Sequence, residues 1–169
     1  MKTKSITLAA VFAALMFVSS IIVIPAGAVP ITLQTCVLAV SSAALLPKEA
    51  FLCTLLHMLI KLAFTSGNAV ITPSFGFVLG FIPAGFLASL YFSKSGKKSR
   101  DIIITILIAG LLPYLPGLGY MAYVLNMLQG KAMSVYQIFK AGMFIFIPGD
   151  ILKGIISFTV IKRLVKIKK

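Results

Sequence analysis

The sequence predicts an all-α, polytopic membrane protein with six transmembrane helices and both termini in the cytoplasm. Of its 169 residues, 60% are hydrophobic, and the mean hydropathy is +1.09. Only 11% are charged, against roughly 25% in soluble domains. A soluble chain of this length has too little interior to bury so many apolar side chains. Since a span needs about 20 apolar residues, the chain forms a single transmembrane domain, residues 1–169, with room for roughly five to seven spans.

The net charge of +13 arises from 16 Lys and Arg against three acidic residues. In a soluble protein this balance would suggest nucleic acid, but here the basic residues lie between apolar runs, as in the positive-inside pattern. They indicate a lipid bilayer as the partner, and nucleic acid is not expected. The outside loops hold Lys131 and Lys140. The residues predicted to be cytoplasmic are Lys2, Lys4, Lys48, Lys94, Lys97, Lys98, Arg100, Lys162, Arg163, Lys166, Lys168 and Lys169.

The first span is predicted at residues 6–24. This apolar run is 19 residues long, longer than the roughly 7–15 of a signal peptide, and further membrane segments follow, so we expect it to be retained. It contains two overlapping Ala-xxx-Ala pairs, which make a flat stripe where another helix can approach closely. From the residues alone, this stripe serves either packing within the chain or docking of a partner. Its members are Ala9, Ala10, Ala13 and Ala14.

The second span is predicted at residues 31–46, after a Pro- and Gly-containing break at residues 25–30. Three polar side chains mark its start, and they either cap the helix or point into a cavity: Thr32, Gln34 and Thr35.

The third span, residues 50–64, follows a tight connection at residues 47–49 and carries two ionisable side chains on one helical face. We interpret His57 as a packed, hydrogen-bonded residue and Lys61 as a side chain that reaches the membrane interface. Isolated cysteines in the second and third spans, Cys36 and Cys53, predict buried free thiols and no metal site.

The remaining three spans are predicted at residues 75–92, 102–125 and about 135–165. In the fourth span, Gly76 and Gly80 allow either close helix packing or room for a ligand. Pro113 and Pro116 break the fifth span, and the tyrosines that follow Pro113 form either an interfacial belt or a lid over a pocket.

The stretch Ala141–Lys153 is apolar until Pro148-Gly149 breaks it, and then an acid and a base stand at i and i+3, Asp150 and Lys153. This spacing places both side chains on one face of a helix, and ionisable groups within a membrane are costly and usually functional. In the predicted topology this break faces outside, as do the breaks at residues 25–34, 65–74 and 126–134. Non-helical backbone at membrane depth is tolerated where it lines a cavity, so we expect an outward-facing binding pocket.

Three motifs occur in order along the chain: VPITLQT at residues 29–35, TPSFGFVLGF at residues 72–81, and the Ala141–Lys153 stretch. Together they resemble the biotin-specific substrate-binding subunit, or S component, of energy-coupling factor transporters, the BioY family. The resemblance covers essentially the whole chain, and its last motif is the most specific. The middle motif departs from the Gly-Pro-Thr-Gly-Gly-Tyr run of the family, and the third span has His57 and Lys61 where the family has an aromatic residue and a glycine.

The resemblance implies a six-helix S component in the bacterial plasma membrane that captures biotin from outside. It would dock on a transmembrane coupling subunit driven by two cytoplasmic ATPases, with the alanine stripe of the first span as the docking surface. ATP is used by those partners, so no cofactor is expected on this chain.

Biotin has a cyclic urea with two N–H donors and a carbonyl, an apolar thioether ring, and a carboxylate tail. A carboxylate accepts from the urea N–H groups, and a cation pairs with the tail or steadies the acid. The expected ligand-binding residues are Asp150, Lys153, Gln34, Thr32, Asn68, Ser74, Phe75, Gly76, Phe77 and Tyr114.

Two alternatives remain at this point. One keeps the architecture but changes the vitamin to thiamine, a queuosine precursor or pantothenate. The other is a small intramembrane enzyme that uses His57, Lys61 and Asp150. The topology places His57 in mid-span and Asp150 towards the outside, and the sequence has neither a Walker-type loop nor a recognisable catalytic constellation. We therefore expect a transport protein rather than an enzyme.

Overall fold

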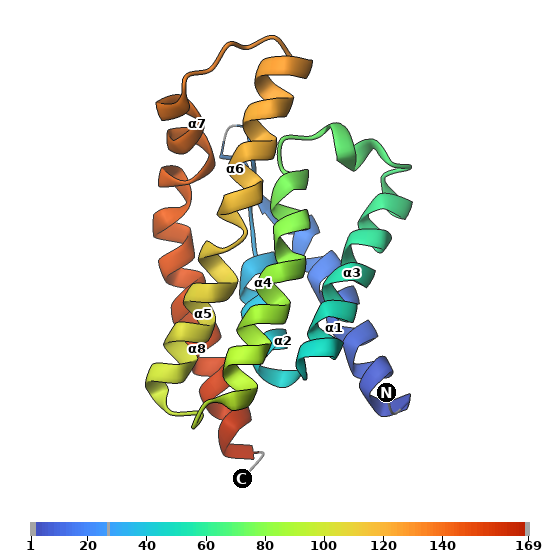
Figure 1. Ribbon diagram of the computed structural model, residues 1–169, viewed down its shortest axis with the longest axis vertical. Helices are drawn as coiled ribbons and strands as arrows, with labels where there is room; N and C mark the ends of the chain where they lie inside the picture. Colours follow the sequence, from blue (N-terminus) through green and yellow to red (C-terminus); the bar gives the residue numbers. More distant parts are fainter. Residues whose placement is uncertain (1–2, 27, 168–169) are drawn as a thin grey trace.

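The computed structural model describes residues 3–26 and 28–167, and in these residues the fold is helical apart from one two-stranded ladder (Figure 1). Its α-helices are α1 (Thr3–Ile21), α2 (Gln34–Ala44), α3 (Pro47–Phe64), α4 (Phe75–Lys94), α5 (Ser99–Leu111), α6 (Tyr114–Tyr123), α7 (Val135–Gly142) and α8 (Ile147–Ile167). The short elements are β1 (Val23–Ile24), β2 (Ile31–Thr32), the 3-10 turns η1 (Asn68–Ile71) and η3 (Phe144–Phe146), and the π-helical turn η2 (Val124–Leu128).

These helices form six rods, because α5, α6 and η2 follow one another as one rod and α7, η3 and α8 as another (Figure 1). The prediction of an all-α fold with six spanning segments is confirmed. By length and composition, α1, α4 and the two composite rods are each able to cross a membrane. The α2 helix is only 11 residues long, and it is extended on its N-terminal side by the β1–β2 hairpin.

The first span ends earlier than predicted, and the second begins later. Ile21 is the last residue of α1, and β1 pairs antiparallel with β2, Val23 opposite Thr32 and Ile24 opposite Ile31. Consecutive β-branched residues lose side-chain freedom in a helix and favour a strand, and Pro25 cannot continue a helix hydrogen-bond ladder. The hairpin brings the polar start of the second span inside the bundle.

Two of the three acidic residues begin helices. The Glu49 carboxylate accepts from the backbone N–H of Leu46 at 3.0 Å, and the Asp101 carboxylate accepts from the backbone N–H of Lys98 at 2.9 Å. A negative charge at a helix N-terminus satisfies free N–H groups and complements the helix dipole. The third span therefore starts at Pro47, three residues before the predicted position.

The two ends of the bundle differ in character. The start of α1, the end of α8 and the basic connection between α4 and α5 lie together at one end, whereas the α3–α4 and α6–α7 connections lie at the other (Figure 1). This grouping agrees with the predicted clustering of basic segments. The assignment of that end to the cytoplasm stays a prediction.

The α4 helix lies centrally and packs against α2, α3, α5 and α6. Two of its glycines allow a close contact with α6 and the residue before it. A Cβ on Gly80 would lie 2.7 Å from the Cα of Pro113, and one on Gly76 would overlap the side chain of Tyr120. The sequence predicts either close helix packing or room for a ligand at Gly76 and Gly80, and the structure shows helix packing at both.

The break in the last span lies before Pro148-Gly149, not at it. Met143 leaves the helical conformation with φ −136° and ψ −58°, η3 follows, and α8 already begins at Ile147. Pro148 therefore occupies the first turn of α8, where a missing N–H costs nothing. Asp150 also lies in this first turn, where the helix dipole favours a negative charge.

The alanine stripe of α1 is divided between two environments. Ala9 and Ala13 are fully buried in the core of the chain itself, whereas Ala10 and Ala14 are exposed. The prediction that all four form a docking surface is therefore wrong for Ala9 and Ala13, because α1 packs that face against α2 and α3. Docking on Ala10 and Ala14 stays a prediction.

Candidate functional site

A pocket opens within the bundle where the sequence motifs converge. It is lined by the hairpin, the start of α2, Lys61 of α3, the first two turns of α4, the α5–α6 junction, Phe146 and the first turns of α8. The cavity volume is about 80 Å³, smaller than the roughly 300–1,000 Å³ of typical small-molecule sites. Every rod except α1 contributes to this central pocket, which explains why its residues are scattered through the sequence.

The charged wall of the central pocket is an ion pair between neighbouring turns of α8. Lys153 Nζ lies 2.5 Å from Asp150 Oδ1, with 10% of the lysine side chain and 30% of the aspartate side chain exposed. The Tyr114 hydroxyl donates a hydrogen bond to Asp150 Oδ2. Each carboxylate oxygen keeps accepting capacity and the ammonium keeps donors, so the pair is able to bind a ligand that has both N–H and C=O groups.

An aromatic wall stands next to the ion pair. The Phe77 ring meets the Tyr114 ring edge to face, with centroids 5.7 Å apart and an interplanar angle of 85°. Room for Phe77 comes from Gly117, where an added Cβ would lie 2.5 Å from a carbon of the Phe77 ring. This arrangement offers an apolar surface to a ligand directly beside the charged groups.

A polar network anchors the start of α2. The Thr32 hydroxyl donates to Gln34 Oε1 at 3.0 Å, and Gln34 Nε2 lies 2.8 Å from Nε2 of His57. Because an amide nitrogen only donates, His57 Nε2 acts as the acceptor and the imidazole is neutral. His57 is fully buried, which confirms its interpretation as a packed, hydrogen-bonded residue. Leu33 occupies the helix N-cap without a side-chain cap, but the Thr32 hydroxyl also accepts from the backbone N–H of Gln34 at 3.5 Å. Thr32 therefore serves both the helix start and the cavity, and Gln34 lines the cavity.

We expect Gln34→Leu to lower the free energy of unfolding by about 1–3 kcal/mol, because it leaves the buried acceptor of His57 without a donor. Thermal unfolding of the purified variant in detergent measures this. Gln129→Leu is the matched control, since Gln129 is exposed. Equal stability of the two variants would contradict the role of this network.

Seven of the ten predicted ligand-binding residues line the central pocket: Asp150, Lys153, Gln34, Thr32, Ser74, Phe77 and Tyr114. Three do not. Asn68 is exposed at the start of η1, the Phe75 ring packs on Tyr120 within the core, and Gly76 is covered by the same tyrosine. Residue spacing shows that these positions lie near the pocket but not which way each side chain points. The binding roles of all ten stay predictions.

Two polar residues outside the predicted ligand-binding set also line the central pocket. Thr35 presents a buried hydroxyl with no hydrogen-bond partner among the described residues. Lys61 lines the pocket from α3, and its interpretation as a side chain that reaches the membrane interface stays a prediction. Its spacing of four residues from His57 places both side chains on one helical face but does not show which way that face points.

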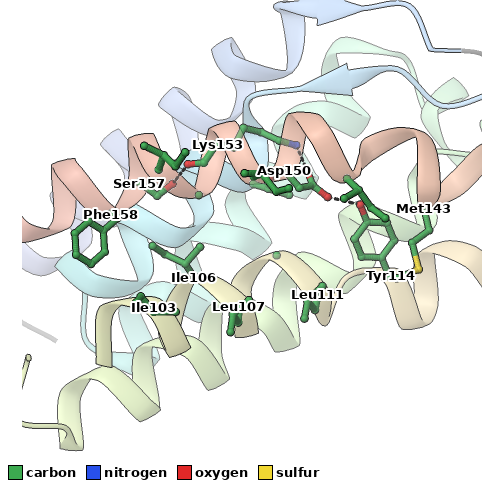
Figure 2. Close-up of a pocket in the computed structure, with 16 residues that line it drawn as sticks. Ile103, Ile106, Leu107, Leu111, Tyr114, Met143, Asp150, Lys153, Ser157 and Phe158 are labelled. Atoms are coloured by element: carbon green, nitrogen blue, oxygen red, sulfur yellow. Dashed lines mark hydrogen bonds and ion pairs between the residues drawn. The ribbon is translucent and has the colours of Figure 1, made fainter. Parts of the chain in front are cut away.

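A second space lies between α5 and α8, on the other side of the ion pair (Figure 2). Its walls are almost wholly apolar, and its rim holds hydrophobic side chains that are about half exposed, such as Ile103, Leu107 and Ile151. Figure 2 shows Asp150 and Lys153 on α8 between Phe158 and Met143, with Tyr114 on the Met143 side of the ion pair. Asp150, Lys153 and Tyr114 line both spaces, and they separate the central pocket from a groove that opens sideways.

Within residues 3–26 and 28–167, no three His, Cys, Asp or Glu side chains group as metal ligands would. What the site offers is one acid, two lysines, neutral hydrogen-bonding groups and an aromatic wall. This is a set suited to binding an organic molecule.

Comparisons with known proteins agree with this picture. The chain is 29% identical over 163 residues to a protein named "Biotin transporter BioY2" of Lactococcus lactis subsp. cremoris (strain MG1363), covering 92% of this chain and 86% of the relative. It is 28% identical to a "Probable biotin transporter BioY" of Lysinibacillus sphaericus, covering 98% and 88%.

The fold matches that of a crystal structure described as the S-component for biotin from an ECF-type ABC transporter, with a TM-score of 0.80, 21% identity, and coverage of 98% of this chain and 95% of that one. The model of the BioY family matches residues 1–169, the full length of the sequence. This chain is a multi-pass membrane protein that belongs to the BioY family.

Proposed function

We propose that the chain is the S component of an energy-coupling factor transporter and that it binds biotin in the central pocket for uptake into the cell. Membership of the BioY family supports this proposal. The structural observation that carries it is the Asp150–Lys153 ion pair, which stands beside the Phe77–Tyr114 aromatic wall in a single pocket.

The chemistry of these groups fits biotin part by part. Asp150 holds unused acceptor capacity for the urea N–H groups, and Lys153 holds unused donors for an oxygen. Hydrogen bonds that involve charged groups are stronger than neutral ones, and a site screened from water strengthens them further. The rings of Phe77 and Tyr114 cover the apolar thioether ring of the ligand.

The chain binds and releases the vitamin, and energy comes from partners. A transmembrane coupling subunit and two cytoplasmic ATPases would supply it, and the ligand would enter from the end of the bundle that carries the hairpin and the α3–α4 connection. The exposed alanines Ala10 and Ala14 offer a small-residue surface on α1 for the coupling subunit, since small side chains allow helices to approach closely. The family assigns the chain a transport role and no catalytic one.

Competition binding tests the identity of the vitamin. The purified chain is saturated with labelled biotin, and unlabelled biotin, thiamine, pantothenate or a queuosine precursor is added. We expect only biotin to displace the label. Displacement by another vitamin at equal or lower concentration would assign the pocket to that vitamin instead.

We expect Tyr114→Phe to weaken biotin binding by about tenfold, because Asp150 loses one hydrogen bond worth about 1.5 kcal/mol. The ring and its contact with Phe77 remain, so the fold is kept. Tyr136→Phe is the matched control on an exposed ring. Equilibrium binding of labelled biotin measures both variants, and unchanged affinity of Tyr114→Phe would show that the hydroxyl does not orient Asp150 for the ligand.

A further inference from the structure

Lys61 is a cation without a counter-charge in the central pocket. All three acidic residues of the chain are engaged elsewhere: Glu49 caps α3, Asp101 caps α5, and Asp150 pairs with Lys153. Within the described part of the chain, the Lys61 ammonium group makes neither a hydrogen bond nor an ion pair. The pocket therefore holds one negative and two positive side chains, and its net charge is +1.

The groups near Lys61 do not neutralise it. His57, one turn earlier on α3, is a neutral imidazole whose acceptor is already bonded to Gln34. The Gln34 carbonyl oxygen already accepts from Thr32. An unpaired ammonium within a membrane protein is costly, and this cost is removed when a ligand brings a negative charge.

Lys61 and the ion pair belong to separate parts of the bundle. The α3 helix packs mainly against α1 and α4, whereas α8 packs mainly against α2 and α5, and both helices contribute to the lining of the central pocket. An elongated ligand with a polar ring at one end and an anion at the other is able to reach both. Such a ligand would meet the Asp150–Lys153 pair with its uncharged polar end and Lys61 with its anionic end.

We propose that Lys61 is the residue that binds the carboxylate of the vitamin, and that the Asp150–Lys153 pair binds the cyclic urea. This inference rests on the proposed function. It assigns the two ends of the ligand: Asp150 accepts from the urea N–H groups, Lys153 donates to the urea carbonyl, and Lys61 donates to the carboxylate. Lys61 thereby selects for a free acid over its ester.

The test compares biotin with biotin methyl ester, which lacks the negative charge, on the purified full-length chain. Lys61→Met keeps an unbranched apolar chain of similar length and removes the charge. We expect this variant to bind biotin about 10–100-fold more weakly, because one charge-assisted hydrogen bond is lost. We expect it to bind the ester with the same affinity as the unchanged chain. Lys61→Arg keeps the charge and is expected to retain the preference for biotin.

Lys140→Met is the matched control, because Lys140 is exposed on α7 and lies outside the central pocket. Retained binding of the ester by Lys61→Met shows that this variant is folded. The inference is overturned if Lys61→Met weakens the binding of both ligands by the same factor, or weakens the binding of neither. It is also overturned if the preference for the free acid is abolished by Lys153→Met and not by Lys61→Met. If the unchanged chain binds neither ligand, the proposed function itself fails, and the inference fails with it.

Discussion

Asp150→Asn is expected to weaken biotin binding by at least about 100-fold. The substitution removes the charged acceptor for the urea N–H groups and leaves Lys153, with only 10% of its side chain exposed, without its counter-charge. Breaking a buried ion pair costs about 3–5 kcal/mol, and the lower value applies here because 30% of the Asp150 side chain is exposed. Equilibrium binding of labelled biotin to the purified variant measures the loss.

The matched control is Asp101→Asn, the same chemical change at an acid far from the pocket. Asp101 lies in the first turn of α5 and accepts from the backbone N–H of Lys98. The amide oxygen of Asn is able to accept the same bond, so this variant is expected to bind biotin normally. If Asp150→Asn binds within threefold of the unchanged chain, the ion pair supports the helix and not the ligand.

Gly80→Leu is expected to prevent the normal packing of α4 on α6. Even a Cβ at this position would lie 2.7 Å from the Cα of Pro113, 2.8 Å from the Pro116 ring and 3.0 Å from the Pro113 carbonyl oxygen. Backbone atoms cannot move aside without displacing the helix, and overpacking typically costs about 1–3 kcal/mol, so a larger side chain here is expected to reach or exceed the upper value. The readouts are the melting temperature and the fraction of monodisperse protein in detergent.

Gly119→Leu is the matched control, because a Cβ on Gly119 would meet nothing within 4 Å. Leucine has a higher helix propensity than glycine, so this variant is expected to be as stable as the unchanged chain or slightly more so. Equal melting temperatures for Gly80→Leu and Gly119→Leu would show that the α4–α6 contact is looser than these distances indicate.

Most of the fold is predictable from the positions of the apolar runs and of the charged residues along the sequence. Six apolar runs separated by basic or Pro- and Gly-containing segments define the six rods, because backbone groups in a membrane are satisfied within helices. The boundaries that sequence reasoning misplaces are those where local chemistry competes with hydropathy. Residues 23–24 are apolar enough for a span, but they form a strand because they are β-branched and paired with residues 31–32.

The Asp150–Lys153 ion pair follows from spacing alone, since i and i+3 share a helical face. The place of Lys61 in the pocket does not follow from spacing, because the direction of its side chain depends on how α3 is rotated within the bundle, where His57 of the same helix lies 2.8 Å from Gln34 of α2. The same limit applies to Phe75 and Phe77, two aromatic residues of one motif. One packs on Tyr120 and the other lines the pocket, and only the position of α6 distinguishes them.

A structure of the chain with biotin bound would show which of the two spaces beside the Asp150–Lys153 ion pair holds the ligand. We expect biotin in the central pocket, with its cyclic urea on Asp150 and Lys153, its thioether ring on Phe77 and Tyr114, and its carboxylate at Lys61. Biotin lying instead in the apolar groove between α5 and α8, or bound without contact to Asp150, would show that the ion pair does not bind the urea in the central pocket.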